Sequence, residues 1–274
     1  MTDRLKEYLK REHTLDLIDS SMWQELYDEA ANELSKYEMR DMTLFMVGEI
    51  GINPVDYMRR VPTAYYYDVN TPKIIIPSQI QTIDDDAFTY SNIENLYLPK
   101  MLTKLCDESF NDCNIAVVWL PWSIADYINN VEVDAYAGIF NNGAFKLGDK
   151  DGNIVHKLTI PSGLTNVSWN NHFQDCTSIE HIIIEEGVED IGPFTFCGCH
   201  NLTTVELPHS MQVIGKETFA YCINLNKIIY NGTYEEFGDI EFETDWLTNG
   251  DGTEHWFDLV CTDGKYELEA GRTV

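Results

Sequence analysis

Residues 188–230 read VEDIGPFTFCGCHNLTTVELPHSMQVIGKETFAYCINLNKIIY, and they contain one short apolar pattern twice. The pattern consists of an Ile, a Phe, a Cys and a Leu, and each member recurs 23 residues later: Ile191, Phe196, Cys199 and Leu202, then Ile214, Phe219, Cys222 and Leu225. A fixed period of this length predicts a solenoid, because one coil can bury its apolar face only by stacking on the next coil.

The same period can be followed towards the N-terminus by its phenylalanines, which are Phe88, Phe110, Phe173, Phe196 and Phe219. Three residues after each Phe stands a small or sulfur-bearing residue: Ser91, Cys113, Cys176, Cys199 or Cys222. The coils also hold a short alternating run that ends in proline, such as Val205-Glu206-Leu207-Pro208. Alternation that ends at a proline predicts one short strand per coil.

The motifs I-x-L-P, I-G-x-x-x-F and C-x-x-L together resemble the BspA-like class of leucine-rich repeat. The copy from Ile191 to Leu202 matches the last two motifs, and so does the following copy. The resemblance covers roughly residues 71–230, with Ser91 in place of the cysteine and Glu185 in place of the proline as departures. It implies a protein-binding scaffold whose repeats contain no catalytic residues.

We therefore expect an α+β protein, a leucine-rich-repeat solenoid with a short-stranded parallel sheet, preceded by a small α-helical N-terminal module. The expected parts are the module at residues 1–61, the repeats at residues 62–230 and an acidic C-terminal cap at residues 231–274. Within the repeats we expect an irregular insertion at residues 122–156, because the chain between Pro121 and Pro161 is longer than one period. Insertions in solenoids form loops, often on the binding face.

The N-terminal module is predicted from apolar residues at helical spacing, which are Met22, Trp23, Leu26, Tyr27, Ala30 and Leu34. Ser20 and Ser21 precede this stripe and can cap the helix. We expect the stripe to pack on the first coil and cover its open end, because terminal repeats need a cap. The alternative is that these helices bind a partner themselves.

Acidic residues dominate the charge of the chain. There are 46 acidic and 18 basic residues, which give a formal charge of -28 at pH 7. Such a field repels nucleic acid and membrane surfaces and attracts a basic protein partner, although the plainer interpretation is a well-solvated surface. A second functional hypothesis is an acidic inhibitor that imitates nucleic acid and blocks a nucleic-acid-binding protein. A helical module followed by these repeats is also similar to some phage-encoded proteins, which favours this hypothesis.

The motifs of common active sites are absent, so we expect no enzyme activity, no cofactor and no metal. The sequence lacks a phosphate-binding glycine loop, a zinc-protease motif and a serine-hydrolase motif. Cys197 and Cys199 form one close pair, but a zinc site needs four ligands and no second pair lies at suitable spacing. The loop at residues 149–153 departs from a calcium loop, because its glycine stands at the fourth place instead of the sixth.

The cysteines and the N-terminus favour a cytoplasmic protein. Four of the 7 cysteines share one repeat column, which predicts a buried column of reduced thiols rather than a disulfide framework. The N-terminus is charged from the start and does not resemble a secretory signal. The longest nearly apolar run, residues 115–125, is too short to span a bilayer.

The predicted binding site is a row of residues on the open face of the sheet. If the apolar residues on either side of them face the core, strand alternation turns Tyr97 and Trp119 outward. Ile75 occupies the equivalent place one coil earlier, and the row continues more weakly through Thr159, Ile183, Glu206 and Ile229. We expect another protein to contact Ile75, Tyr97, Trp119 and Ile183. The alternative is that the N-terminal helices or the 122–156 insertion cover the row.

Overall fold

The computed structural model describes residues 30, 32, 34–35, 39, 59–62, 65–66, 68–134, 145–164, 171–248 and 256–269. The chain divides into two compact units, which are unit 1, Met1–Ile115 with Tyr136–Asn142, and unit 2, Ala116–Ala135 with Gly143–Val274. The predicted α-helical module of residues 1–61 lies, apart from a few of its residues, outside the described part of the chain. The prediction that this module covers the first coil concerns the same residues and stays a prediction.

In unit 1, each coil contributes one longer and one shorter strand to two parallel sheets. The longer strands are β2 (Asn70–Ile75) and β4 (Asn92–Tyr97), which pair in parallel with Ile75 beside Tyr97. The shorter strands are β1 (Arg60–Val61), β3 (Thr82–Ile83) and β5 (Lys104–Leu105). The side chains that point between the two sheets form the core of this unit, among them Ile74, Ile83, Leu96 and Leu105.

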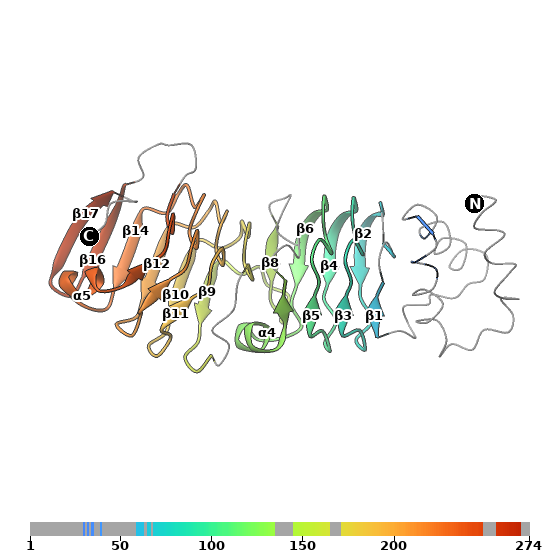
Figure 1. The fold of residues 1–274 in the computed structure, drawn as a ribbon, viewed down its shortest axis with the longest axis horizontal. Coiled ribbons are helices and arrows are strands. Elements are labelled where there is room, and N and C mark those ends of the chain that lie inside the picture. The colour runs from blue at the N-terminus through green and yellow to red at the C-terminus, as the bar shows by residue number, and fades with distance from the viewer. Residues whose placement is uncertain are drawn as a thin grey trace, which may run out of the picture. The chain divides into compact units, whose positions relative to one another are not determined.

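Unit 2 repeats this arrangement with more coils. Its wide sheet consists of β9 (Lys157–Ile160), β10 (His181–Ile184), β12 (Thr204–Leu207), β14 (Lys227–Tyr230), β16 (Trp256–Cys261) and β17 (Gly264–Glu269). Figure 1 shows these strands side by side, and all pairs are parallel except β16 with β17. The narrow sheet consists of β11 (Asp190–Ile191), β13 (Val213–Ile214) and β15 (Glu241–Phe242).

The region predicted as an irregular insertion, residues 122–156, contains regular elements where the structure describes it. Helix α4 (Ile124–Asn130) begins at Ser123, whose side chain accepts the N–H of Asp126. Strand β7 (Glu132–Val133) follows, and β8 (Lys146–Gly148) pairs in parallel with β6 (Asn114–Trp119). The chain thus forms a short strand at β8 that adds to the sheet instead of an open loop.

The solenoid with short parallel strands that the repeat predicts is confirmed. Its core in unit 2 is a column of phenylalanines: the rings of Phe173 and Phe196, and of Phe196 and Phe219, are stacked with centroids 5.6 Å apart. In unit 1, Phe88 and Phe110 stack in the same way. The columns end on aromatic residues outside the repeat pattern, Tyr66 stacked on Phe88 and Trp246 edge-on to Phe219.

A second column consists of the cysteines, and their predicted burial is confirmed. Cys176, Cys199 and Cys222 are fully buried, and the structure assigns no disulfide to any described cysteine. The thiols of Cys199 and Cys222 each donate to a phenylalanine carbonyl of the preceding coil, 3.2 Å away. Burial raises the pKa of the Cys113 thiol to about 12 and that of Cys222 further still. Ser91 takes the same place in its coil, where its hydroxyl donates to the Tyr66 carbonyl.

The turn after Phe173 places a carboxyl group between coils. Asp175 has left-handed backbone, with φ 57°, and its side chain fills the space above Gly198 of the next coil. A Cβ on Gly198 would lie 1.9 Å from Oδ1 of Asp175, so only glycine fits there. Burial raises the pKa of Asp175 from 3.8 to about 6. The ionised carboxylate therefore destabilises the folded state at neutral pH.

Phe196→Ala should lower the free energy of unfolding by roughly 3 to 5 kcal/mol, because it removes a fully buried ring that stacks on two neighbours. Chemical denaturation measures this change. The matched control is Ile223→Ala, since Ile223 is 54% exposed and should change stability by less than about 0.5 kcal/mol. A loss of under about 1 kcal/mol for Phe196→Ala would contradict the stacked column.

Cys199 and Cys222 should react with a thiol reagent only after denaturation, because both are buried and their raised pKa values keep them protonated. The measurement is labelling in native buffer at pH 8, with each site identified by peptide mass. Cys106, which is only half-buried, is the internal control and should be labelled first. Labelling of Cys199 at the rate of Cys106 would place the cysteine column at the surface.

Asp175→Asn should stabilise the protein at neutral pH and not in acid. Because the folded-state pKa is raised, Asp175 favours folding fully below about pH 4, and this contribution is lost as the pH rises through 6. Allowing for partial solvent contact of the carboxyl, we expect a gain of about 1 to 2 kcal/mol at pH 7.5 and none at pH 4. Urea denaturation at both pH values tests this, with the exposed Asp151→Asn as control. An equal effect at both pH values would rule out the titration as its cause.

Candidate partner-binding surface

Strand alternation in unit 2 separates a core face from an open face. In β10, β12 and β14 the second and fourth residues are buried, and the first and third are partly exposed. The third residues of β9, β10, β12 and β14 lie in register with one another and with Val260 of β16, and they form one row, which consists of Thr159, Ile183, Glu206, Ile229 and Val260. Its first four members follow the order that the repeat spacing predicts. Val260 was missed because the repeat pattern ends before β16, although alternation of Phe257, Leu259 and Cys261 marks that strand.

In unit 1, two of the predicted contact residues lie together on the open face. Ile75 on β2 is 60% exposed, and Tyr97 on β4 lies beside it in register. The Nζ atom of Lys73 lies 4.8 Å from the centroid of the Tyr97 ring, which is a cation–π distance. This part of the surface therefore presents an aliphatic side chain, an aromatic ring and a cation close together.

Trp119 lies on β6 and is partly exposed, and its neighbour in register is Gly148 on β8. A Cβ on Gly148 would lie 2.1 Å from Cε3 of Trp119, so the indole occupies the space that a side chain at residue 148 would need. The residue next to Trp119 is thus Gly148, and not Thr159 as the continuous row required. Trp119 and Ile183 belong to different sheets, and the pairing does not bring them together.

A hollow of about 420 Å³ lies on the open face of the wide sheet in unit 2. Its lining consists of Ile183, Ile184, Glu186, Glu206, Leu207, Pro208, Ile229, Tyr230, Asn231, Val260, Cys261 and Thr262. The hollow thus follows the row that contains the predicted residue Ile183. Burial raises the pKa of the Cys261 thiol to about 11, so this thiol is protonated at neutral pH and unsuited to act as a nucleophile.

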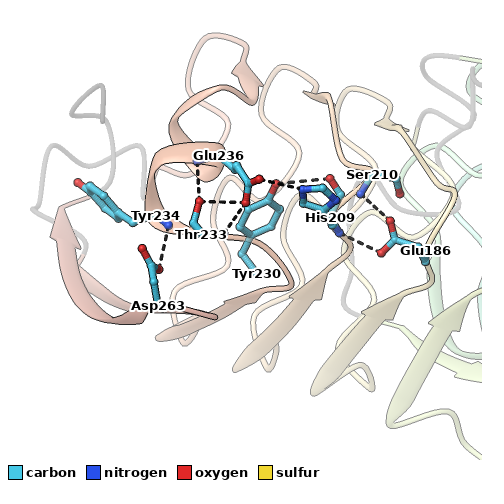
Figure 2. Close-up of polar contacts among 8 residues, drawn as sticks. All are labelled: Glu186, His209, Ser210, Tyr230, Thr233, Tyr234, Glu236 and Asp263. Atoms are coloured by element: carbon cyan, nitrogen blue, oxygen red, sulfur yellow. Dashed lines mark hydrogen bonds and ion pairs between the residues drawn. The ribbon is translucent and has the colours of Figure 1, made fainter.

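One wall of the hollow is held by hydrogen bonds between coils, which Figure 2 shows. The carboxylate of Glu186 accepts the backbone N–H groups of His209 and Ser210, at 3.1 and 2.9 Å. The Tyr230 hydroxyl donates to the carbonyl of His209 over 3.4 Å. These contacts join three successive coils at the same end of their strands, so the wall cannot move without breaking several bonds.

Helix α5 (Tyr234–Gly238) extends this wall. Thr233 and Glu236 form a capping box at its start, and the hydrogen bonds from Thr233 lower the pKa of Glu236. The N–H of Tyr234 donates to Oδ1 of Asp263, which ties the helix to the turn between β16 and β17. Local sequence explains the helix start, because Thr followed three residues later by Glu is a capping-box pattern.

Three histidines of unit 2 contact a glutamate of the next coil, and sequence reasoning treated them as scattered. The pairs are His156 with Glu180 at 3.0 Å, His181 with Glu206 at 2.7 Å, and His209 with Glu236 at 3.3 Å. A search for His and Glu separated by slightly more than one period would have found them. Of these six residues, only Glu206 lines the hollow.

The described residues show no sign of a metal centre or a membrane span. Within them, no group of three or more His, Cys, Asp or Glu side chains could hold a metal ion. No helix in these ranges is both long enough and apolar enough to cross a bilayer. The cytoplasmic location expected from the sequence stays a prediction.

Comparisons with solved structures find three proteins of low sequence identity. One is a leucine-rich repeat protein from Bacteroides ovatus, with 14% identity and a TM-score of 0.37, covering 75% of this chain and 53% of that one. Another is a leucine-rich cell surface protein from Faecalibacterium prausnitzii, with 12% identity and a TM-score of 0.22, covering 69% and 81%. The pneumococcal vaccine antigen PcpA has 13% identity and a TM-score of 0.28, covering 69% and 72%. This chain thus spans about half the length of the Bacteroides protein.

No curated protein matches the chain in sequence, and the comparisons give no support to a phage origin. The family model for the BspA type leucine rich repeat region matches six copies, over residues 59–132 and 126–248. These ranges contain the phenylalanine column, the cysteine column and the strands of the open face up to β14. The chain therefore belongs to the family of proteins built from BspA-type leucine-rich repeats.

Proposed function

We propose that this protein recognises another protein through the open face of its parallel sheets and performs no catalysis itself. The observation that carries the proposal is the set of apolar and aromatic side chains that point outward in register, Ile75 with Tyr97 in unit 1 and Ile183, Ile229 and Val260 in unit 2. A leucine-rich-repeat fold is typically a scaffold for protein interaction, which supports the same reading.

The rigidity of the sheet makes these side chains suitable anchors. Strand pairing and the buried core fix the backbone on which they stand, so a partner does not have to order a mobile loop when it binds. Aromatic residues on such a surface commonly contribute most of the binding energy. Tyr97 and Trp119 are the aromatic members of the predicted set, and both are partly exposed.

The formal charge of -28 supports a basic partner. Nothing in the described geometry favours the second hypothesis, an acidic mimic of nucleic acid. The two hypotheses differ in their response to salt, because screening weakens charge pairing and leaves apolar contacts largely intact. The salt dependence of binding is therefore measured together with the contribution of single residues.

Tyr97→Ala and Trp119→Ala should each reduce capture of the native partner by at least about tenfold, because truncation of an aromatic anchor typically costs 2 kcal/mol or more. The measurement is affinity capture from the native cell with the full chain as bait, at low and high salt, with mass spectrometry. Met101→Ala is the matched control, since Met101 is 52% exposed and lies outside the longer strands. The wild-type capture should survive high salt.

Melting temperatures separate binding from internal packing. If the aromatic side chains bind a partner, the two variants should melt within about 2 °C of the wild type, whereas a ring covered by the protein's own chain should lower the melting temperature by several degrees. A double variant that melts normally and captures every wild-type partner would refute the proposal. Capture that disappears at high salt would mean that charge pairing, and not the apolar side chains of the open face, contributes most of the binding.

A further inference from the structure

The hollow of unit 2 combines apolar walls with negative charge. Glu206 lies in register between Ile183 and Ile229, so an isoleucine stands on each side of its carboxylate. Val260 follows Ile229 in the same row. The twelve lining residues include the two acids Glu186 and Glu206 and no lysine, arginine or histidine. A ligand that fits this lining has an apolar part and a positive charge.

The two acids of the lining differ in what they already bind. Both carboxylate oxygens of Glu186 accept backbone N–H groups of the neighbouring coil, which uses this side chain for the wall. Glu206 contacts the ring of His181, with Nε2 and Oε1 2.7 Å apart, and its side chain remains 37% exposed. Apolar neighbours reduce the screening of a carboxylate by water, so a cation at Glu206 is attracted more strongly than on an open surface.

We propose that this hollow receives a lysine or arginine side chain from an extended segment of a basic protein partner. The cation pairs with Glu206, and the aliphatic stem lies on Ile183, Ile229 and Val260. The inference rests on the proposed function, because it names the partner chemistry of the same sheet face. Lysine and arginine fit because they pack their methylene stems on apolar surface while the charged end remains at a polar group.

The size and charge of the site support this occupant. A volume of about 420 Å³ falls within the usual range of ligand pockets, about 300 to 1,000 Å³. The charge of the whole chain is strongly negative, which raises the local concentration of basic segments and speeds their encounter with the hollow. An acidic segment would meet repulsion both at long range and at Glu206.

A display library of random peptides of about twelve residues, selected on the full chain at pH 7.5, tests the proposal. The most enriched peptides should contain lysine or arginine beside aliphatic residues. Fluorescence anisotropy with labelled synthetic copies then measures Kd for the wild type, Glu206→Gln and Ile229→Lys. Both variants should weaken binding by about tenfold or more, since each removes one half of the site. Replacing the basic residue of the peptide with norleucine should have the same effect.

The matched controls make the same substitutions at positions outside the hollow. Glu189→Gln and Ile223→Lys lie at exposed positions outside the lining and should leave Kd within about twofold. Equal melting temperatures for all variants confirm that each one is folded.

Enriched peptides without lysine or arginine, or a Kd unchanged by Glu206→Gln, would overturn the inference. Failure to enrich any peptide would overturn it too. None of these results tests the proposed function, because that proposal is tested separately by partner capture with the Tyr97 and Trp119 variants.

Discussion

The stacking of one coil on the next is the interaction on which the structure depends. A single coil has a row of apolar side chains and no second layer to cover them, so burial requires an identical coil at a fixed distance. The interplanar angles of 9° and 6° along Phe173, Phe196 and Phe219 show how closely the copies match. The aromatic column lies on the core side, which leaves apolar side chains of the open face available for recognition.

The period of the sequence predicted the fold and the order of the outward residues within each sheet, because a repeat fixes which residues lie in register. It did not predict that the row is interrupted beside Trp119. It did not predict Tyr66, Trp246 or Val260, which lie at places where an array begins or ends. At such places a side chain has one repeat neighbour instead of two, so other residue types fit. The contact of His181 with Glu206 was missed for another reason: it joins different positions of successive coils, and a column of equivalent residues does not show it.

Some of the acidic residues have a structural role, whereas the sequence alone indicated only a well-solvated surface. Glu185 accepts the N–H of Ser162, Glu186 accepts two N–H groups, and Glu243 accepts the N–H of Lys216. Each bond joins neighbouring coils and satisfies a backbone donor in a turn, where no strand partner exists. These glutamates thus connect the coils and also contribute to the negative charge that would attract a basic partner.

Strand β17 has a consequence for how such an array can change its length. It runs antiparallel to β16, and Lys265 and Glu267 are exposed along it. A further parallel coil would need a parallel neighbour at this edge, and charged side chains on an edge strand discourage the addition of any strand. A coil added by repeat duplication would therefore keep its parallel pairing in this sheet if it were inserted before β16, which places variation in repeat number inside the array.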